Sequence, residues 1–226
     1  MINIVFKITT LFYKILYMLT CKHIKLRGSL YAIRINGNKS NSIDINGELS
    51  HSNITIDGNN NCICSHGIIR HTNIKIIGNN NSVSLEHECI IQNSTITIRA
   101  NNASFVIGKK SNILSGIFIC QGHNNYIHIG DNCLFSANVE LWNSDTHTIF
   151  DDKGKIINQS KPILVGDHVW IGKHAKILKG VTIGENAVIG MCSVVSKNIE
   201  PNTINAGIPC KQIKKGINWD KALIME

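Results

Sequence analysis

The chain has 226 residues and a formal net charge of +8 at neutral pH, with 17% charged and 43% hydrophobic residues. This length and composition predict one domain with a sizeable core and argue against extensive disorder. The 41 isoleucines and 28 asparagines favour stacked strands over a helix bundle, because β-branched side chains suit packed strands and Asn tolerates the left-handed backbone of sharp corners.

Residues 1–22 are predicted to form an amphipathic helix. Polar residues recur there at three- and four-residue steps opposite an apolar stripe, and Lys7 and Lys14 interrupt the run that a membrane span would need. No small-residue cleavage site follows, as a secretory signal would require. We expect this helix to cap the open end of the fold or to pack on a neighbouring subunit, with weak binding to a membrane surface as the alternative.

The eight cysteines show no CxxC pair of the kind found in zinc ribbons and redox motifs. Most lie among Ile and Val, where a reduced thiol acts as a small apolar side chain. A reducing compartment is therefore expected. We predict a cytoplasmic protein, or one peripheral to the inner face of the cell membrane if residues 1–22 bind lipid.

An aliphatic residue returns at every sixth place from Val165 to Val195. The hexads read VGDHVW, IGKHAK, ILKGVT, IGENAV and IGMCSV. A six-residue period fits one flat face of a triangular coil with about 18 residues per turn and the aliphatic side chain pointing inward. Successive coils are expected to pair as parallel strands about 4.8 Å apart.

The same phase appears upstream, in hexads that start at Ile129, Phe135 and Leu141. Further back the repeat is looser. The segments IDGNNN at 56–61 and IIGNNN at 76–81 recur twenty residues apart. We interpret them as irregular coils of the same stack with Asn-rich corners.

These patterns divide the chain into three parts. The helix over 1–22 precedes an all-β parallel β-helix over 23–205, and a basic C-terminal tail covers 206–226. Within the β-helix, residues 148–164 carry charges and Pro162 where a hexad is due, which predicts an excursion loop.

The hexads and three further blocks resemble the hexapeptide-repeat acetyltransferases. The blocks are WNSDTHTIFD at 142–151, KPILVGDHVWIG at 161–172 and AGIPCKQIKK at 206–215. The branch resembled is that of the galactoside and maltose acetyltransferases and the O-acetyltransferases of bacterial surface polysaccharides. The motifs cover residues 105–219, and residues 24–104 share only the repeat texture. The resemblance implies a left-handed β-helix, a homotrimer, and acetyl-CoA bound between neighbouring chains.

Acetyl transfer to a sugar hydroxyl requires a base and a site that stabilises the oxyanion. The resemblance assigns the base to His147, which stands where the hexads break into the loop. On an extended backbone Asn143, Asp145 and His147 project to one side. Asp145 or Asp151 is then expected to hold the other ring nitrogen and to set the tautomer.

The resemblance also assigns the binding of acetyl-CoA. Trp170 is expected to be exposed beside the thioester, where it packs the pantetheine and limits the acyl group. The other predicted cofactor contacts are Lys173, Met191, Ser196, Lys197, Lys211 and Lys214. Compared with the galactoside acetyltransferases, Met191 replaces a small residue, and Lys211 and Lys214 replace arginines. These differences predict a narrower cofactor groove and weaker binding of the CoA phosphates. The predicted acceptor contacts are Trp142, Asn143 and Asn124.

Two other ligand classes are disfavoured. His168 and His174 are six residues apart, which places them on adjacent faces, so no metal site is expected. Lys and Arg are spread without aromatic platforms or a recognition motif, so nucleic acid is not an expected partner, although the basic surface suits an anionic glycan.

The predicted function is an acetyl-CoA-dependent O-acetyltransferase that acts on a bacterial capsular or other surface polysaccharide or on its sugar precursor. An amino-sugar N-acetyltransferase is the alternative enzyme. A non-catalytic β-helix that binds glycan is the alternative outside enzymes.

Overall fold

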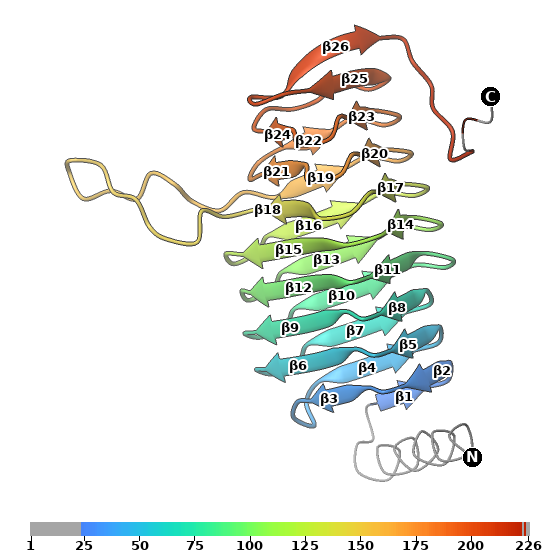
Figure 1. The fold of residues 1–226 in the computed structure, drawn as a ribbon. Coiled ribbons are helices and arrows are strands. Elements are labelled where there is room, and N and C mark those ends of the chain that lie inside the picture. Colours follow the sequence, from blue (N-terminus) through green and yellow to red (C-terminus); the bar gives the residue numbers. More distant parts are fainter. Residues whose placement is uncertain (1–23, 223, 225–226) are drawn as a thin grey trace.

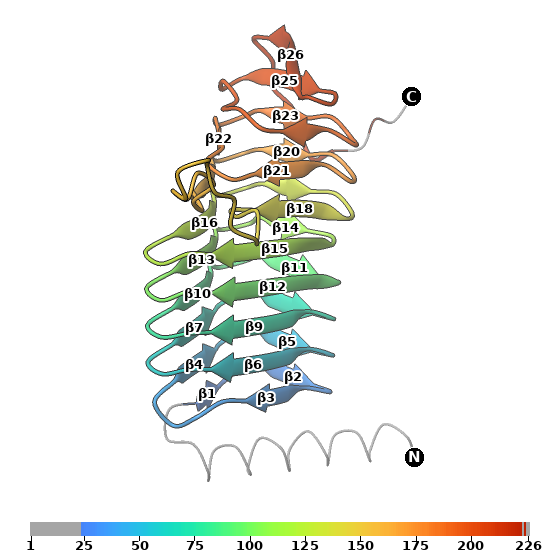
Figure 2. The ribbon, with the colours of Figure 1, turned by 90° about the vertical axis from the view of Figure 1, so that its left-hand side faces the viewer.

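The protein is a three-sided stack of short strands (Figures 1 and 2). The computed structural model describes residues 24–222 and 224, and the helix predicted over residues 1–22 lies outside this range. Apart from the last strand, neighbouring strands of a sheet are parallel and one turn apart, and eight turns are complete in the described part of the chain. The predicted all-β parallel β-helix is thereby confirmed.

We call the three sheets faces A, B and C, and the corners between them AB, BC and CA in chain order. Face A contains β1 (Ile24–Leu26), β4 (Ser42–Ile45), β7 (Cys62–Ser65), β10 (Ser82–Leu85), β13 (Ser104–Ile107), β16 (Tyr126–Ile129), β19 (Ile163–Val165) and β22 (Thr182–Ile183). Face B contains β2 (Ser29–Tyr31), β5 (Glu48–Ser50), β8 (Ile68–Arg70), β11 (Ile90–Gln92), β14 (Asn112–Ile113), β17 (Leu134–Phe135), β20 (Trp170–Ile171), β23 (Val188–Ile189), β25 (Thr203–Ala206) and β26 (Lys211–Lys215). Face C contains β3 (Arg34–Asn36), β6 (Asn53–Asp57), β9 (Asn73–Ile77), β12 (Ser94–Arg99), β15 (Gly116–Gln121), β18 (Val139–Trp142), β21 (Lys176–Leu178) and β24 (Val194–Val195).

The core is a column of inward-pointing side chains along the axis of the stack. The aliphatic residue that opens each regular hexad is almost completely buried, as the hexads predict. Trp170 on β20 pairs with Val188 on β23, eighteen residues later. Upstream the turns are longer, since Ser42 pairs with Cys62 and Cys62 pairs with Ser82, in steps of twenty residues. The face C strands are longer there, since β6 and β9 contain five residues each whereas β21 contains three and β24 two.

The Asn-rich segments form corner CA, as predicted. Asn60, Asn80, Asn102 and Asn124 each adopt a left-handed backbone with φ between 53° and 57°, a conformation that Asn tolerates better than most residues. The next residues, Asn61 and Asn81, are buried, and each donates its amide to a main-chain carbonyl of the neighbouring coil. These inward amides satisfy main-chain groups that a sharp corner would otherwise leave unpaired.

The regular stack is interrupted once, between β18 and β19, by a loop over residues 143–162. It begins earlier than the predicted 148, because the side chain of Asn143 turns inward and leaves the following residues outside the stack. Its hairpin, closed by a bridge between Phe150 and Ile156, projects away from the coils (Figures 1 and 2).

The C-terminal segment is more than a basic tail. Its strand β26 runs antiparallel to β25 and extends face B. After β26 the chain turns back beside the stack, and the indole of Trp219 donates a hydrogen bond of 2.8 Å to the carbonyl of His168. Residues 24–222 contain no helix of the length and apolarity that crossing a bilayer requires.

Candidate active site

His147 lies in the loop that leaves the stack at corner CA. Its side chain is exposed and borders a pocket of about 390 Å³. The coils below the loop supply Arg99, Gln121 and His123 to the same pocket, and the returning segment of the loop supplies Ser160. Gly122, with φ of 87°, lies so close to Ser160 that a Cβ at this position would overlap its hydroxyl. The loop is therefore seated directly on the coil that carries His123.

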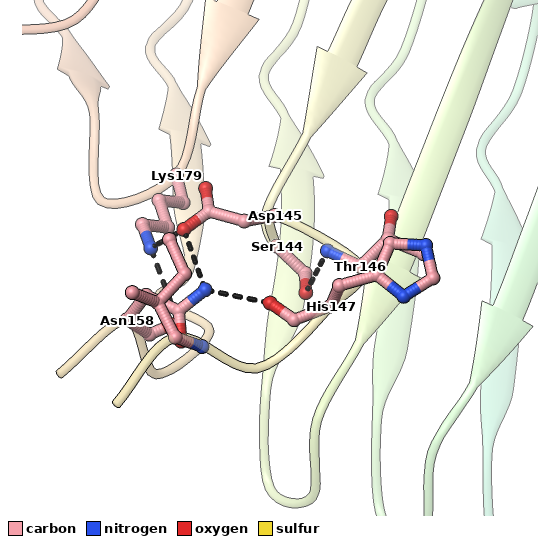
Figure 3. Close-up of polar contacts among 7 residues, drawn as sticks. Ser144, Asp145, Thr146, His147, Asn158 and Lys179 are labelled. Carbon is pink, nitrogen blue, oxygen red and sulfur yellow. Dashed lines mark hydrogen bonds and ion pairs between the residues drawn. The ribbon is translucent and has the colours of Figure 1, made fainter. Parts of the chain in front are cut away.

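The backbone of His147 is held by a side-chain amide. The Nδ2 of Asn158 donates to the carbonyl of His147 at 2.7 Å and to the carboxylate of Asp145 at 3.0 Å (Figure 3). Lys179, from the coil above, pairs with Asp145 and donates to the carbonyl of Asn158 at 3.1 Å. The two ends of the loop are thus tied to each other and to the stack. Neither Asn158 nor Lys179 was indicated by the sequence pattern.

Asp145 has a different role from the one predicted. Its carboxylate faces Lys179 and Asn158, whereas the imidazole of His147 points away from it (Figure 3). The ion pair with Lys179, helped by the hydrogen bond from Asn158, holds the pKa of Asp145 below its usual value. Asp145 therefore positions the loop that carries His147 instead of setting the tautomer of its ring.

Asp151, the alternative partner of the imidazole, is occupied in the hairpin. Its carboxylate accepts hydrogen bonds from the main-chain N–H groups of Lys153 at 3.0 Å and Lys155 at 2.8 Å. These bonds form because the turn of the hairpin exposes unpaired N–H groups. Among the described residues, no carboxylate binds the ring of His147.

The predicted acceptor contacts separate in the structure. Asn143 is completely buried. Its Oδ1 accepts a hydrogen bond of 2.7 Å from the N–H of Gln121, and its Nδ2 donates one of 3.1 Å to the carbonyl of Gln121. Asn143 is therefore a corner residue whose side chain does not reach a sugar acceptor. Trp142 is half-buried and donates to Glu140 at 2.9 Å. Asn124 is exposed on corner CA, one residue beyond His123, and its Oδ1 accepts a bond from Asn102.

Trp170 lies on face B, where 39% of its surface is exposed. Trp219, to which the sequence pattern gave no role, lies beside it. The ring centroids of Trp170 and Trp219 are 5.9 Å apart, and the ring planes make an angle of 42°. Trp219 in turn stacks on His168 with a centroid distance of 4.3 Å. The two indoles form an apolar surface on the side of the stack away from His147.

The remaining predicted cofactor contacts lie in three places. Lys173 and Met191 occupy equivalent places on corner BC, where the residue after Met191 donates its N–H to the carbonyl of Lys173 at 2.8 Å. Lys211 and Lys214 are exposed on β26, at the end of face B. The residues on corner CA, above the loop, are Ser196 and Lys197.

A single chain therefore presents the candidate base and most of the candidate cofactor contacts on different sides. His147 is at corner CA, whereas Trp170 is on face B and Lys173 is at corner BC. Face C separates the two corners. A site that uses both sets needs a second copy of the chain.

Comparison with known proteins supports the predicted resemblance. Residues 162–197 match the family described as bacterial transferase hexapeptide (six repeats). The galactoside O-acetyltransferase of Escherichia coli (strain K12) is 43% identical over 97 residues, which are 42% of this chain and 47% of that enzyme. The chain spans less than half the length of this and the next curated relatives it matches.

Two solved structures are similar over most of the chain. The polysialic-acid-specific acetyltransferase NeuO is 26% identical with a TM-score of 0.68, covering 89% of this chain and 90% of NeuO. The polysialic acid O-acetyltransferase OatWY is 27% identical with a TM-score of 0.62, covering 87% and 92%. The resemblance to hexapeptide-repeat acetyltransferases is therefore confirmed.

Proposed function

We propose that this protein transfers the acetyl group of acetyl-CoA to a hydroxyl of a bacterial capsular or other surface polysaccharide, or of its sugar precursor. The observation that carries the proposal is the exposed imidazole of His147 in a pocket, on a loop that Asn158 and Lys179 hold to the stack. The acetyltransferase relatives support the class of reaction.

His147 would act as the general base. The imidazole takes the proton of the sugar hydroxyl while the hydroxyl oxygen attacks the thioester carbonyl, and the same proton then goes to the sulfur of the departing CoA. No covalent bond to the enzyme forms. Asn158 donates to the carbonyl of His147 and to the carboxylate of Asp145, which holds the loop that carries the ring although no carboxylate binds the ring's other nitrogen among the described residues.

The site would lie between copies of the chain in a homotrimer of left-handed β-helices. In such a ring, corner CA of one copy, with His147, faces corner BC of the next, with Lys173 and Met191. The exposed Trp170 would pack the pantetheine arm, and the lysines of β26 would meet the phosphates.

Mass spectrometry of products, after the protein is offered acetyl-CoA with a glycan panel, tests the proposed reaction. We expect one added acetyl ester, removable by mild alkali, on a carboxylated or neutral surface glycan. Acetylation at an amino group, which resists mild alkali, would instead support an N-acetyltransferase. Binding of glycan without any transfer would support a non-catalytic β-helix.

Mixing two inactive variants tests the shared site. One carries His147→Ala and the other carries both Trp170→Ala and Lys173→Glu, so each lacks one side of every site. After the subunits are mixed and reassembled in equal amounts, about one quarter of the sites in a closed ring should pair two intact sides. We expect activity to recover to that level and light scattering to give three times 25.0 kDa. A monomer, or a mixture no more active than its parts, would contradict the shared site.

A further inference from the structure

The pocket beside His147 contains cationic and polar groups but no carboxylate. Arg99, Gln121 and His123 line its lower side, and none of its lining residues, all within the described part of the chain, is acidic. The whole chain carries a net charge of +8. An anion that enters this pocket therefore meets favourable charge at long range and no repulsion at contact.

Arg99 lines this pocket from the end of a face C strand. It ends β12 and pairs in register with Gln121, the last residue of β15. Two other arginines, Arg27 and Arg70, each pair with a carboxylate on a neighbouring coil, whereas Arg99 has no carboxylate partner among residues 24–222. Its exposed guanidinium keeps its donors available for a ligand.

His123 interrupts a ladder of asparagines at the level of the pocket. Along corner CA the N–H of Asn59 donates to the Oδ1 of Asn79 at 2.8 Å, and the N–H of Asn79 donates to the Oδ1 of Asn101 at 2.7 Å. On the next coil, the N–H of Asn101 donates to the Nδ1 of His123 at 3.0 Å. Histidine thus takes over the acceptor role that asparagine has on the coils below.

This bond sets the tautomer of His123. Because Nδ1 accepts a hydrogen bond from a main-chain N–H, the neutral ring carries its proton on Nε2. An asparagine at this position would satisfy the ladder equally well. Histidine differs in the position of its free N–H: Nε2 lies on the far side of the ring from Nδ1, further from the main chain than an asparagine amide reaches, and the residue lines the pocket that also contains Arg99.

We propose that Arg99 and the Nε2–H of His123 bind an anionic group of the acceptor, on the sugar that is acetylated or on its neighbour. The acceptor is therefore an acidic glycan, with a carboxylate or a phosphate as the recognised group. This inference rests on the proposed acetyl transfer, because the pocket is the one beside His147. It adds two specificity-determining residues that act on the acceptor and not on acetyl-CoA.

The test compares acceptors that differ only in charge. Acetyl transfer is measured with a sialic acid oligomer, with the same oligomer after its carboxylates are reduced to alcohols, and with a phosphodiester-linked oligosaccharide. We expect Arg99→Gln to lower kcat/KM for the preferred charged acceptor roughly 10- to 100-fold, and to lower it much less for the reduced one, since a hydrogen bond to a charged group is lost. Preference for the phosphodiester would identify phosphate as the recognised group.

Two further variants separate recognition from folding. His123→Asn restores the asparagine ladder and replaces the distant Nε2–H by a shorter amide, so it should fold normally and lose part of the preference for charge. Arg34→Gln also removes a guanidinium, but from β3, which lies on face C far below the pocket. This variant should keep the preference for the charged acceptor. Equal losses on charged and reduced acceptors in Arg99→Gln would overturn the proposal.

The outcome also distinguishes this inference from the proposed function. Wild-type transfer that is equally efficient on charged and reduced oligomers would overturn the acidic subsite and leave the acetyltransferase intact. If no glycan is acetylated, the proposed function fails, and saturation-transfer NMR with the sialic acid oligomer tests the subsite alone. Binding that Arg99→Gln weakens and Arg34→Gln keeps would support it, and binding unchanged in Arg99→Gln would overturn it.

Discussion

Replacing His147 by alanine is expected to lower kcat for acetyl transfer about 100-fold or more, with the fold and the affinity for acetyl-CoA preserved. The side chain is exposed at the pocket, so its removal leaves no cavity in the core. A general base contributes mainly in the transition state, so the loss should appear in kcat and not in ground-state binding. Steady-state kinetics and calorimetric titration with acetyl-CoA measure the two quantities separately.

A second histidine provides the control for this experiment. His87 is exposed on corner AB, outside the pocket, and its ring contacts only the ring of His66 among the described aromatic pairs. His87→Ala should therefore keep wild-type turnover. Near-normal turnover of His147→Ala would remove this residue from the mechanism.

Replacing Phe118 by alanine is expected to reduce the free energy of unfolding by about 3–5 kcal/mol. Phe118 is fully buried in the axial column, where its ring lies 5.5 Å from that of Phe105. It is paired in register with Ile96 below and Leu141 above. The stack cannot close the resulting cavity, because hydrogen bonds between strands on three faces fix the spacing of the coils. Urea unfolding followed by circular dichroism measures the change.

The loop offers a matched control for the loss of this aromatic ring. Phe150 is 58% exposed in the hairpin, and Phe150→Ala removes the same atoms without opening a buried cavity. Its effect on the free energy of unfolding should stay within about 0.5 kcal/mol. A cost for Phe118→Ala as small as this would contradict a close-packed axial column.

The repeating part of this protein could be predicted from the order of its residues alone. Each hexad specifies one strand and one corner, so the pattern of six residues shows which side chain points inward. Val165 and Ile183 open such hexads, and both are buried as predicted. The Asn-rich corners are equally local, because a left-handed residue such as Asn80 or Asn102 reflects backbone preference and not distant contacts. The loop near 148 was visible because it breaks that period.

The way the site is built depends on contacts between coils that lie far apart in the sequence. Alternation along an extended chain placed Asn143 beside His147, but the coil below offers the main chain of Gln121, and the buried amide binds there. Asp145 meets Lys179, thirty-four residues further along the chain, because winding puts the next turn of corner CA above the loop. Such partners depend on which coil lies above or below and on how many residues each turn contains. Neither quantity is encoded in the few residues around a motif, and for this reason the motif identified His147 while its supporting residues appeared only in the folded chain.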